Sequence, residues 1–291
     1  MTTVTESAHA KINLTLEVLG KRADGFHNLV TVIATVGLCD TLTFTGADEI
    51  KLLDDGGIPA TDNLVLRAAN ELQRHAGVPD GAHISLDKKV PEAAGLGGGS
   101  ADAAATLRGL NRLWRLEMTL PELAAVGAAI GSDVPFLVYE GAALVQGRGE
   151  EVVPIPRPPI DRVLILSPEI RVAEKTRTLF SRMKPSFYTR GTLSHKLAAR
   201  IRAGHDAPAE FFFNAFEPLA PEVFSGWQEY RDGLAALGAR EITLSGAGPS
   251  MFAVPPTREL ATAWLLLLTR TRGWTAFLTE PFMPASESAR C

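Results

Sequence analysis

The stretch Pro91-Glu-Ala-Ala-Gly-Leu-Gly-Gly-Gly-Ser100-Ala-Asp-Ala-Ala104 decides the fold, because it joins a glycine-rich loop directly to a helix. Apolar residues recur at helical spacing from Ser100 to Trp114, so we predict a helix that begins at Ser100. Side chains are absent from Gly97 to Gly99, so backbone N–H groups can approach a ligand closely. The partly positive helix N-terminus points its free N–H donors at the same place. The segment therefore predicts a polyphosphate site, where Ser100 donates its hydroxyl to a phosphate, caps the helix, or both.

Two other interpretations of this loop are weaker. A glycine string alone is typical of a flexible surface turn, and no GK[ST] follows it as a Walker A motif requires. In a GxGxxG pattern read from Gly95 and Gly97, Ser100 occupies the position of the third glycine, which disfavours a dinucleotide-binding fold.

The bulk composition and the length predict a soluble globular protein of one large domain or two smaller ones. The chain has 291 residues, 46% of them hydrophobic and 21% charged. This length reaches the ~250–300 residues at which one hydrophobic core stops growing. The segment Val152–Pro159 contains four prolines and cannot be a central strand or a helix. We take it as the junction between an N-terminal domain, residues 1–157, and a C-terminal domain, residues 158–291.

Charge, cysteines and hydropathy exclude several classes of protein. The net charge is −4, whereas proteins that bind nucleic acid usually carry a basic excess. The two cysteines form no CxxC pair, and the N-terminus has no signal-peptide layout. The densest apolar run, Ala263–Leu268, is six residues long, whereas a membrane span needs ~20. We expect a cytoplasmic protein that binds neither nucleic acid nor membrane, as a monomer or a homodimer.

Periodicity predicts alternating strands and helices along the chain. Alternation, β-branched content and helical stripes predict strands at 10–19, 30–36, 40–45, 83–86, 163–166, 241–244 and 251–254. They predict helices at 63–75, 119–130 and 258–272, and helical material within 217–238. The tetrapeptide Thr119-Leu-Pro-Glu122 is typical of a capping box. The segments 54–62 and 284–291 are predicted to be a loop and a loose tail.

Further residues suggest a site for phosphoryl transfer. Asp133 follows a predicted helix end and precedes an apolar run, so it is either a carboxylate base or an N-cap for the next helix. Lys11 lies in an otherwise uncharged strand, as a pocket cation or an edge gatekeeper. A lysine beside Asp133 would keep that carboxylate charged and oriented. The second glycine cluster, Leu244-Ser-Gly-Ala-Gly-Pro-Ser250, is either a tight turn or a second wall of the same cleft.

Three of these segments together resemble the GHMP kinases, a superfamily of small-molecule kinases. They are Ala10-Lys-Ile-Asn13, Pro91–Ala101 and Leu244–Ser250. The loop Lys21-Arg-Ala-Asp-Gly-Phe-His27 resembles the cytidine-binding loop of the members that act on a cytidylated methylerythritol. Gly131-Ser-Asp-Val-Pro135, Asp62-Asn-Leu64 and Asn214-Ala-Phe-Glu217 fit the same members, in the same order along the chain.

The resemblance implies an α+β fold of two domains, with a C-terminal antiparallel sheet covered by helices and an active site in the cleft between the domains. It implies transfer of the γ-phosphoryl group of ATP, accompanied by Mg²⁺, to the 2-hydroxyl of cytidylated methylerythritol in non-mevalonate isoprenoid biosynthesis. Asp133 would be the general base and Lys11 its partner, with no metal ligands assigned in the chain. ATP would contact Asn63, Lys88, Pro91, Glu92, Ala93, Ala94, Gly95, Leu96, Gly97, Gly98, Gly99, Ser100 and Ala101. The acceptor would contact Asn13, Phe26, His27, Thr176, Phe180 and Gly246.

Two alternatives remain open at this point. One is a GHMP kinase for another alcohol, such as homoserine or mevalonate, although those acceptors offer no base for the aromatic loop to stack on. The other is a catalytically silent nucleotide-binding module, which has no need to keep both Lys11 and Asp133.

Overall fold

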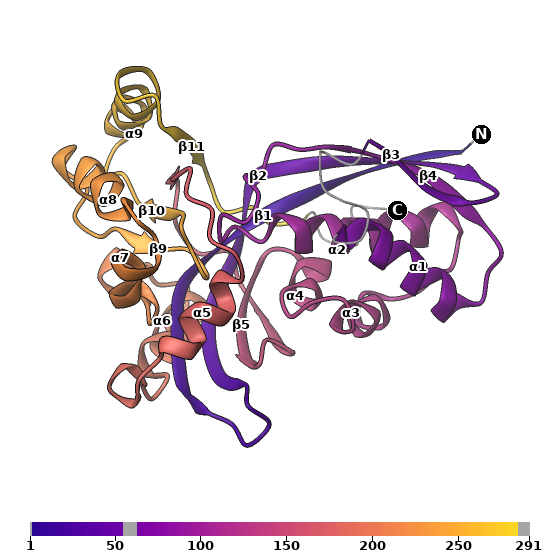
Figure 1. Ribbon diagram of the computed structural model, residues 1–291, viewed down its shortest axis with the longest axis horizontal. Coiled ribbons are helices and arrows are strands. Elements are labelled where there is room, and N and C mark those ends of the chain that lie inside the picture. Colours follow the sequence, from indigo (N-terminus) through magenta and orange to yellow (C-terminus); the bar gives the residue numbers. More distant parts are fainter. Residues whose placement is uncertain (1, 55–62, 285–291) are drawn as a thin grey trace. The chain divides into compact units, whose positions relative to one another are not determined.

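The computed structural model describes residues 2–54 and 63–284, and its chain forms two compact units (Figure 1). Unit 1 consists of Met1–Ala10, Leu38–Glu92 and Gly97–Glu140. Unit 2 consists of Lys11–Gly37, Ala93–Leu96 and Gly141–Cys291. The predicted boundary at residues 157 and 158 falls within unit 2, and the division into two sequential domains stays a prediction.

Unit 1 combines antiparallel strand pairing with a layer of helices. Two long strands, β1 (Thr3–Lys21) and β2 (His27–Ala47), begin in one unit and end in the other. Residues 41–47 of β2 pair antiparallel with β4 (Gly81–Asp87), which pairs parallel with β3 (Ile50–Asp54). The helices of this unit are α1 (Leu64–Ala76), α2 (Gly98–Leu113), α3 (Leu120–Ala128) and α4 (Val134–Tyr139).

Helix α2 is the central helix of unit 1, and small residues let it pack closely. Its residues from Ala101 to Leu110 are all buried. A Cβ atom at Gly109 would lie 2.3 Å from Cε2 of Phe44 on β2, so only glycine allows this approach. The close packing fixes the direction of α2, and with it the place where the glycine-rich loop ends.

Unit 2 contains a separate antiparallel sheet. Its strands lie in the order β11 (Thr275–Thr279), β7 (Val163–Ser167), β10 (Met251–Ala253) and β9 (Thr243–Leu244). The unit also contains β5 (Ala142–Gly147) paired with residues 29–34 of β2, β6 (Glu151–Ile155) paired with β5, and β8 (Phe213–Asn214) paired parallel with β1 at Thr15 and Leu16.

Helices cover this sheet and complete its core. They are α5 (Lys175–Arg182), α7 (Ala220–Val223), α8 (Trp227–Ala236) and α9 (Arg258–Leu266), whereas α6 (Thr192–Arg202) packs near β5 and β6. Shorter helical turns are η1 (Pro185–Phe187), η2 (Ala209–Phe211), η3 (Glu217–Leu219) and η4 (Leu267–Thr271). The core joins strand residues such as Leu164 and Leu166 to Trp227 and Leu234 of α8. The predicted α+β class, with helices against a C-terminal antiparallel sheet, is confirmed.

The structure corrects several predicted element bounds. Helix α2 begins at Gly98, two residues before Ser100, because Gly97 adopts the left-handed conformation of its N-cap at φ 70°. The predicted strands at 30–36 and 40–45 are one continuous strand, β2. The helix predicted at 258–272 ends at Leu266, and the π-helical turn η4 follows it. The capping box at Thr119 and Glu122 is confirmed. Residues 55–62 and 285–291 of the predicted loop and tail lie outside the described residues.

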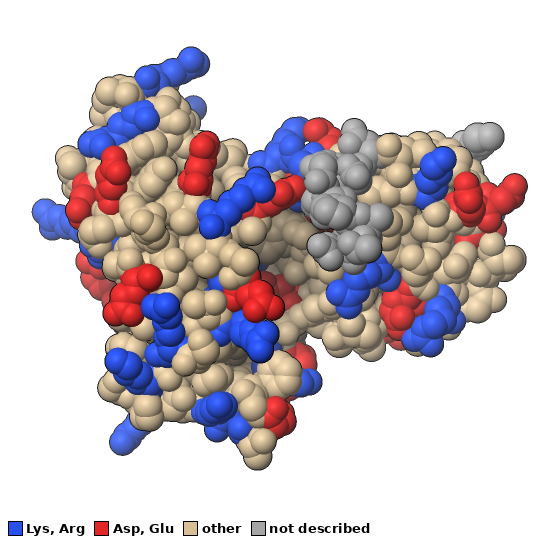
Figure 2. All heavy atoms as spheres, viewed as in Figure 1, with Lys and Arg blue, Asp and Glu red and all other residues tan. Residues whose placement is uncertain are grey.

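The surface carries mixed charges on the face shown in Figure 2, and the described helices include no membrane span. On the face shown in Figure 2, lysine and arginine side chains are interspersed with aspartate and glutamate. Within residues 2–54 and 63–284, no helix combines the length and the apolar character that crossing a bilayer requires.

Candidate active site

The two glycine clusters meet in unit 2. The backbone N–H of Ser250 donates to the carbonyl oxygen of Ala94 at 3.0 Å. The Ser245 hydroxyl donates to the carbonyl oxygen of Gly95 at 3.1 Å. A Cβ atom at Gly95 would lie 2.3 Å from the Ser245 carbonyl oxygen, and the φ of Gly95 is +86°. Glycine is therefore required by both space and backbone conformation. Residues 245–248 form the tight turn of the first interpretation, since the Gly248 N–H donates to the Ser245 carbonyl at 2.8 Å, and this turn also contacts the first glycine cluster.

Lys11 and Asn13 of β1 lie against this junction. The backbone N–H of Lys11 donates to the Leu96 carbonyl at 2.8 Å, and its ammonium donates to Asn13 Oδ1 at 2.7 Å. Asn13 donates in turn to the Thr31 hydroxyl at 2.8 Å. A Cβ atom at Gly246 would lie only 2.6 Å from Lys11 Nζ. Lys11 is 4% exposed, so the gatekeeper interpretation is wrong and the pocket-cation interpretation fits.

In unit 1 the loop ends at the N-terminus of α2. The N-cap residue, Gly97, has no side chain that could accept from the backbone N–H groups of the first turn. A Cβ atom at Gly98 would lie 3.1 Å from Cγ1 of Val90 and 3.4 Å from Nζ of Lys88. Ser100 is the third residue of the helix and not its N-cap. Of its two predicted roles, only the phosphate contact remains open.

Lys88 is held in a buried cluster with two carboxylates. Its ammonium lies 2.6 Å from Oδ2 of Asp40 and 2.8 Å from Oδ2 of Asp102. Asp40 also accepts backbone hydrogen bonds from Lys89 and Val90. Burial raises the pKa of Asp102 to about 7, against the opposing effect of the Lys88 charge. The pKa of Lys88 is itself raised, because the attraction of the two carboxylates outweighs the cost of burying its charge.

The surroundings of the α2 N-terminus fit a nucleotide. Asn63, the N-cap of α1, uses Oδ1 to accept from the Val65 N–H at 2.9 Å, but its buried Nδ2 has no hydrogen-bond partner among the described residues. Leu64 lies next to the start of α2, since its Cδ1 is 3.6 Å from where a Cβ of Gly99 would be. A buried amide donor without a partner is costly. A ligand acceptor beside the phosphate loop would satisfy it.

Asp133 occupies the N-cap position of α4, yet it does not act as a side-chain cap. It adopts φ −83° and ψ −16°, and its carboxylate makes no capping hydrogen bond to the helix. The neighbouring Gly131 lies beside the first turn of α2, because its Cβ would be 3.9 Å from the Ser100 hydroxyl. The predicted N-cap position of Asp133 is confirmed, but its side chain does not cap the helix. The turn that carries its carboxylate is close to the predicted phosphate site.

Aromatic rings gather around the loop of residues 22–26 in unit 2. His27 stacks on Phe180 with ring centroids 4.9 Å apart and an interplanar angle of 21°. Tyr188 meets His27 edge-on, with ring centroids 6.1 Å apart. Burial and the charge of Lys21 lower the pKa of His27. Phe26 is 56% exposed, and the guanidinium of Arg148 lies 4.9 Å from its ring centroid.

Helix α5 carries Thr176 and Phe180, and it also brings a residue that the sequence patterns missed. Thr176 is exposed on the first turn, whereas Phe180 points into the aromatic group. Lys175, the first residue of α5, contacts the carbonyl oxygens of Ala93 and Gly248, one from each glycine cluster. Residues 169–180 show little similarity to the corresponding segment of the GHMP kinases that the other motifs resemble. The only signal in residues 169–180 was a basic residue next to Thr176.

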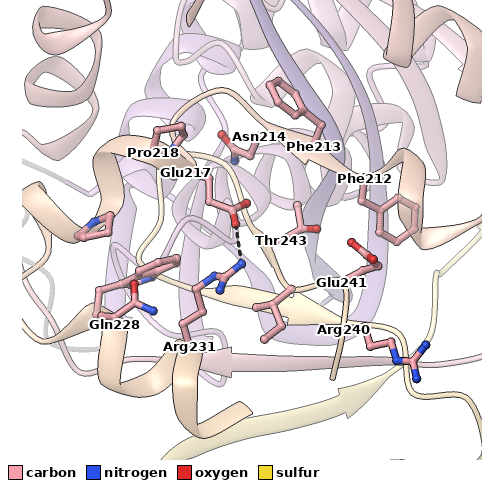
Figure 3. A pocket seen from close by; sticks show the side chains of 13 residues that line it. Phe212, Phe213, Asn214, Glu217, Pro218, Gln228, Arg231, Arg240, Glu241 and Thr243 are labelled. Atoms are coloured by element: carbon pink, nitrogen blue, oxygen red, sulfur yellow. Dashed lines mark ion pairs between the residues drawn. The ribbon is translucent and has the colours of Figure 1, made fainter. Parts of the chain in front are cut away.

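A pocket of about 470 Å³ also lies in unit 2 (Figure 3). Its charged residues include Glu217, which pairs with Arg231 at 3.5 Å as the dashed line shows. Asn214 lines it and donates to the carbonyl oxygens of Leu244 and Gly246 at 2.8 and 2.9 Å. None of the predicted catalytic, ATP-binding or substrate-binding residues lines this pocket. The pocket adjoins the second glycine cluster through these two hydrogen bonds of Asn214.

Comparison with known proteins agrees with this geometry. Residues 63–141 match the family described as GHMP kinases N terminal domain. A curated protein of Dehalococcoides mccartyi named 4-diphosphocytidyl-2-C-methyl-D-erythritol kinase is 38% identical over 256 residues, which are 87% of this chain and 90% of that protein.

Solved structures give the same result for the fold. A crystal structure of 4-(cytidine 5'-diphospho)-2C-methyl-D-erythritol kinase is 31% identical and covers 96% of this chain and 99% of its own, with a TM-score of 0.80. A homoserine kinase from Cytophaga hutchinsonii has a TM-score of 0.73 but only 19% identity, covering 97% of this chain and 95% of its own. The homoserine kinase shares the fold, and its likeness says nothing further.

Proposed function

Because the chain belongs to the 4-diphosphocytidyl-2-C-methyl-D-erythritol kinase family of GHMP kinases, we propose that it transfers the γ-phosphoryl group of ATP to the 2-hydroxyl of that cytidylated alcohol. The observation that carries the proposal is the 38% identity to a named kinase of this substrate over 90% of that protein. The reaction belongs to non-mevalonate isoprenoid biosynthesis. A cytoplasmic location and a monomeric or homodimeric state remain predictions.

The transfer step needs a base and an oriented cation. Asp133 takes the proton of the 2-hydroxyl, the hydroxyl oxygen bonds to the γ-phosphorus, and the bond from that phosphorus to the bridging oxygen breaks to release ADP. Lys11 would keep Asp133 charged and oriented, and Lys11 itself is held by Asn13 and by the loop carbonyl of Leu96. These roles suit a phosphoryl transfer in which the protein mainly positions groups and stabilises charge.

The nucleotide would be held by the loop and by the start of α2. Backbone N–H groups from Gly97 to Ser100 would bind the phosphates, helped by the positive end of the helix dipole. The Nδ2 of Asn63, which has no hydrogen-bond partner within residues 2–54 and 63–284, would donate to the nucleoside. Mg²⁺ bound with ATP would neutralise charge on the phosphates. The ammonium of Lys88 already pairs with two carboxylates. Lys88 would therefore contribute to ATP binding by its position next to Gly98 of the loop.

The aromatic group would bind the cytosine end of the acceptor. Exposed Phe26 offers a ring face on which the base can stack. His27 and Phe180, which stack on each other, offer a second aromatic surface. Asn13, Thr176 and Gly246 would lie along the phosphate and erythritol portion. Homoserine and mevalonate contain no nucleobase that could stack on these rings. The aromatic group therefore favours the cytidylated acceptor.

Asp133→Asn tests the transfer step. The amide keeps the shape of the carboxylate but cannot take a proton, so kcat should fall by about 10²–10⁴-fold while binding of ATP and the melting temperature change little. Ser132→Ala, at an exposed neighbour, is the matched control. Turnover of Asp133→Asn near that of the wild type would remove Asp133 from the mechanism.

Release of ADP on a panel of acceptors tests the substrate. We expect turnover with the cytidylated methylerythritol in the presence of Mg²⁺, and none with homoserine or mevalonate. Turnover of only a non-cytidylated alcohol would reject the substrate and keep the kinase class. No turnover with any acceptor, together with tight ATP binding, would favour the silent nucleotide-binding module.

A further inference from the structure

Lys175 joins the two glycine clusters. Its ammonium contacts the Ala93 carbonyl in the first cluster and the Gly248 carbonyl in the second, and all three residues belong to unit 2. The other links between these clusters are the hydrogen bonds of Ala94 and Gly95 with Ser250 and Ser245. Lys175 is therefore the charged member of a junction that otherwise consists of neutral hydrogen bonds.

The backbone on both sides of this contact is in an unusual conformation. Glu174, the N-cap of α5, has φ +47°, and Ala93 has φ +50°. Residues other than glycine rarely adopt positive φ, and such conformations persist where the surroundings impose them, often at functional sites. These two turns aim the Lys175 side chain and the Ala93 carbonyl at each other.

The position is electrostatically unfavourable for a lysine. Lys175 is the first residue of α5, where the helix dipole disfavours a positive charge. Within residues 2–54 and 63–284, no carboxylate lies within ion-pair distance of it. Lys11 on β1 is the charged group that faces it, while Glu174 and Arg177 on its own helix pair with each other at 3.3 Å. Burial, and then the charge of Lys11, lower its pKa to about 7.

We propose that Lys175 is a positioning residue that ties the phosphate loop to the second glycine cluster and makes nucleotide binding proton-linked. This inference rests on the proposed use of the loop for ATP. Nucleotide binding favours the loop shape that the charged ammonium holds, so it draws a proton onto Lys175. The charged form makes the stronger hydrogen bonds to the two carbonyls and holds the loop in its binding shape.

Proton uptake during nucleotide binding tests the proposal without any turnover. The Mg²⁺ complex of the non-hydrolysable analogue adenylyl imidodiphosphate is titrated calorimetrically at about pH 8, in two buffers of different ionisation enthalpy. The wild type should take up about half a proton or more beyond Lys175→Met, and the protonation of the nucleotide itself cancels in that difference. Lys196→Met, at an exposed lysine of α6, should match the wild type.

The pH profile of kinetics is the second measurement. At about pH 6, kcat/KM for ATP should be about 10-fold lower in Lys175→Met than in the wild type, mainly through KM. The ratio should approach one at about pH 8.5, where Lys175 of the free enzyme is neutral. Lys175→Arg, which keeps its charge, should lose this pH dependence.

The outcomes separate this inference from the proposed function. Equal proton uptake by the wild type and Lys175→Met, with both binding the analogue, would overturn the proton link even if the kinase assignment holds. A kinetic defect of Lys175→Met that stays constant with pH would reduce Lys175 to a structural contact. Proton uptake as expected without turnover of the cytidylated acceptor would keep the inference and reject the acceptor.

Discussion

Lys88 lies near Gly98 in unit 1 and Lys175 contacts Ala93 in unit 2, and the two lysines have opposite electrostatic surroundings. Two buried carboxylates surround the ammonium of Lys88 and raise its pKa. Lys175 meets carbonyl oxygens and another lysine, and its pKa falls to about 7. The carboxylates fix Lys88 as a permanent charge that holds structure together. The protonation of Lys175, in contrast, can change when a ligand binds. The partners of each ammonium therefore decide whether the lysine has a structural or a functional role.

Removing the Lys88 charge should have the largest effect. Lys88→Met leaves Asp40 and Asp102 buried without their cation, so the free energy of unfolding at pH 7 should fall by about 3–5 kcal/mol in urea denaturation. The control is Lys89→Met, whose lysine is 60% exposed and pairs loosely with Asp87 at 3.5 Å; it should change stability by less than about 0.5 kcal/mol. Similar losses in the two variants would remove the structural role assigned to Lys88.

Gly95→Ala should come next, because it disrupts the junction that Lys175 joins. The new methyl group would overlap the Ser245 carbonyl, and the φ of +86° is unfavourable for alanine, so a loss of about 2–3 kcal/mol and a higher KM for ATP are expected. Gly25→Ala isolates the backbone contribution, since Gly25 has φ +87° and nothing within 4 Å of an added Cβ. It should cost about 1 kcal/mol in thermal unfolding. An equal cost in both variants would show that the two clusters do not pack as closely as described.

The smallest effect is a pH dependence of stability. Between about pH 7 and its ordinary value of 10.5, Lys175 binds a proton in the unfolded chain and not in the folded one, so stability rises with pH. Relative to Lys175→Met, the wild type should gain about 2 kcal/mol of unfolding free energy between about pH 7 and about pH 9. Lys88, with its raised pKa, stays charged in both states over this window. A flat difference would mean that the Lys175 charge is not desolvated.

The sequence predicted the parts of the site that local pattern encodes. The glycine loop leading into α2, the capping box at Thr119 and the strand that carries Lys11 all follow from neighbouring residues. The meeting of Gly95 with Ser245 was left open, because no local pattern reports a contact between segments 150 residues apart. The family resemblance supplied the roles of Lys11 and Asp133.

What the sequence missed depends on distant partners or unusual backbone. Lys88 directly follows β4, and its partner Asp40 lies 48 residues away on β2. The predicted contact of Lys88 with the nucleoside stays a prediction. Lys175 is aimed by the positive φ of Glu174, which neither propensity nor periodicity reveals. Strand β2 continues through Gly37, whose N–H bonds to the carbonyl of Glu280 near the other end of the chain.

The proline-rich segment 152–159 has a consequence for self-association. Its first part is β6, which among the described strands pairs only with β5, so it forms an edge of the sheet. Pro154 lies within this strand, and Pro156, Pro158 and Pro159 follow it. Proline offers no N–H to an incoming strand, and an open edge is a template for aggregation. The prolines therefore guard this edge against the pairing of one copy with another during folding.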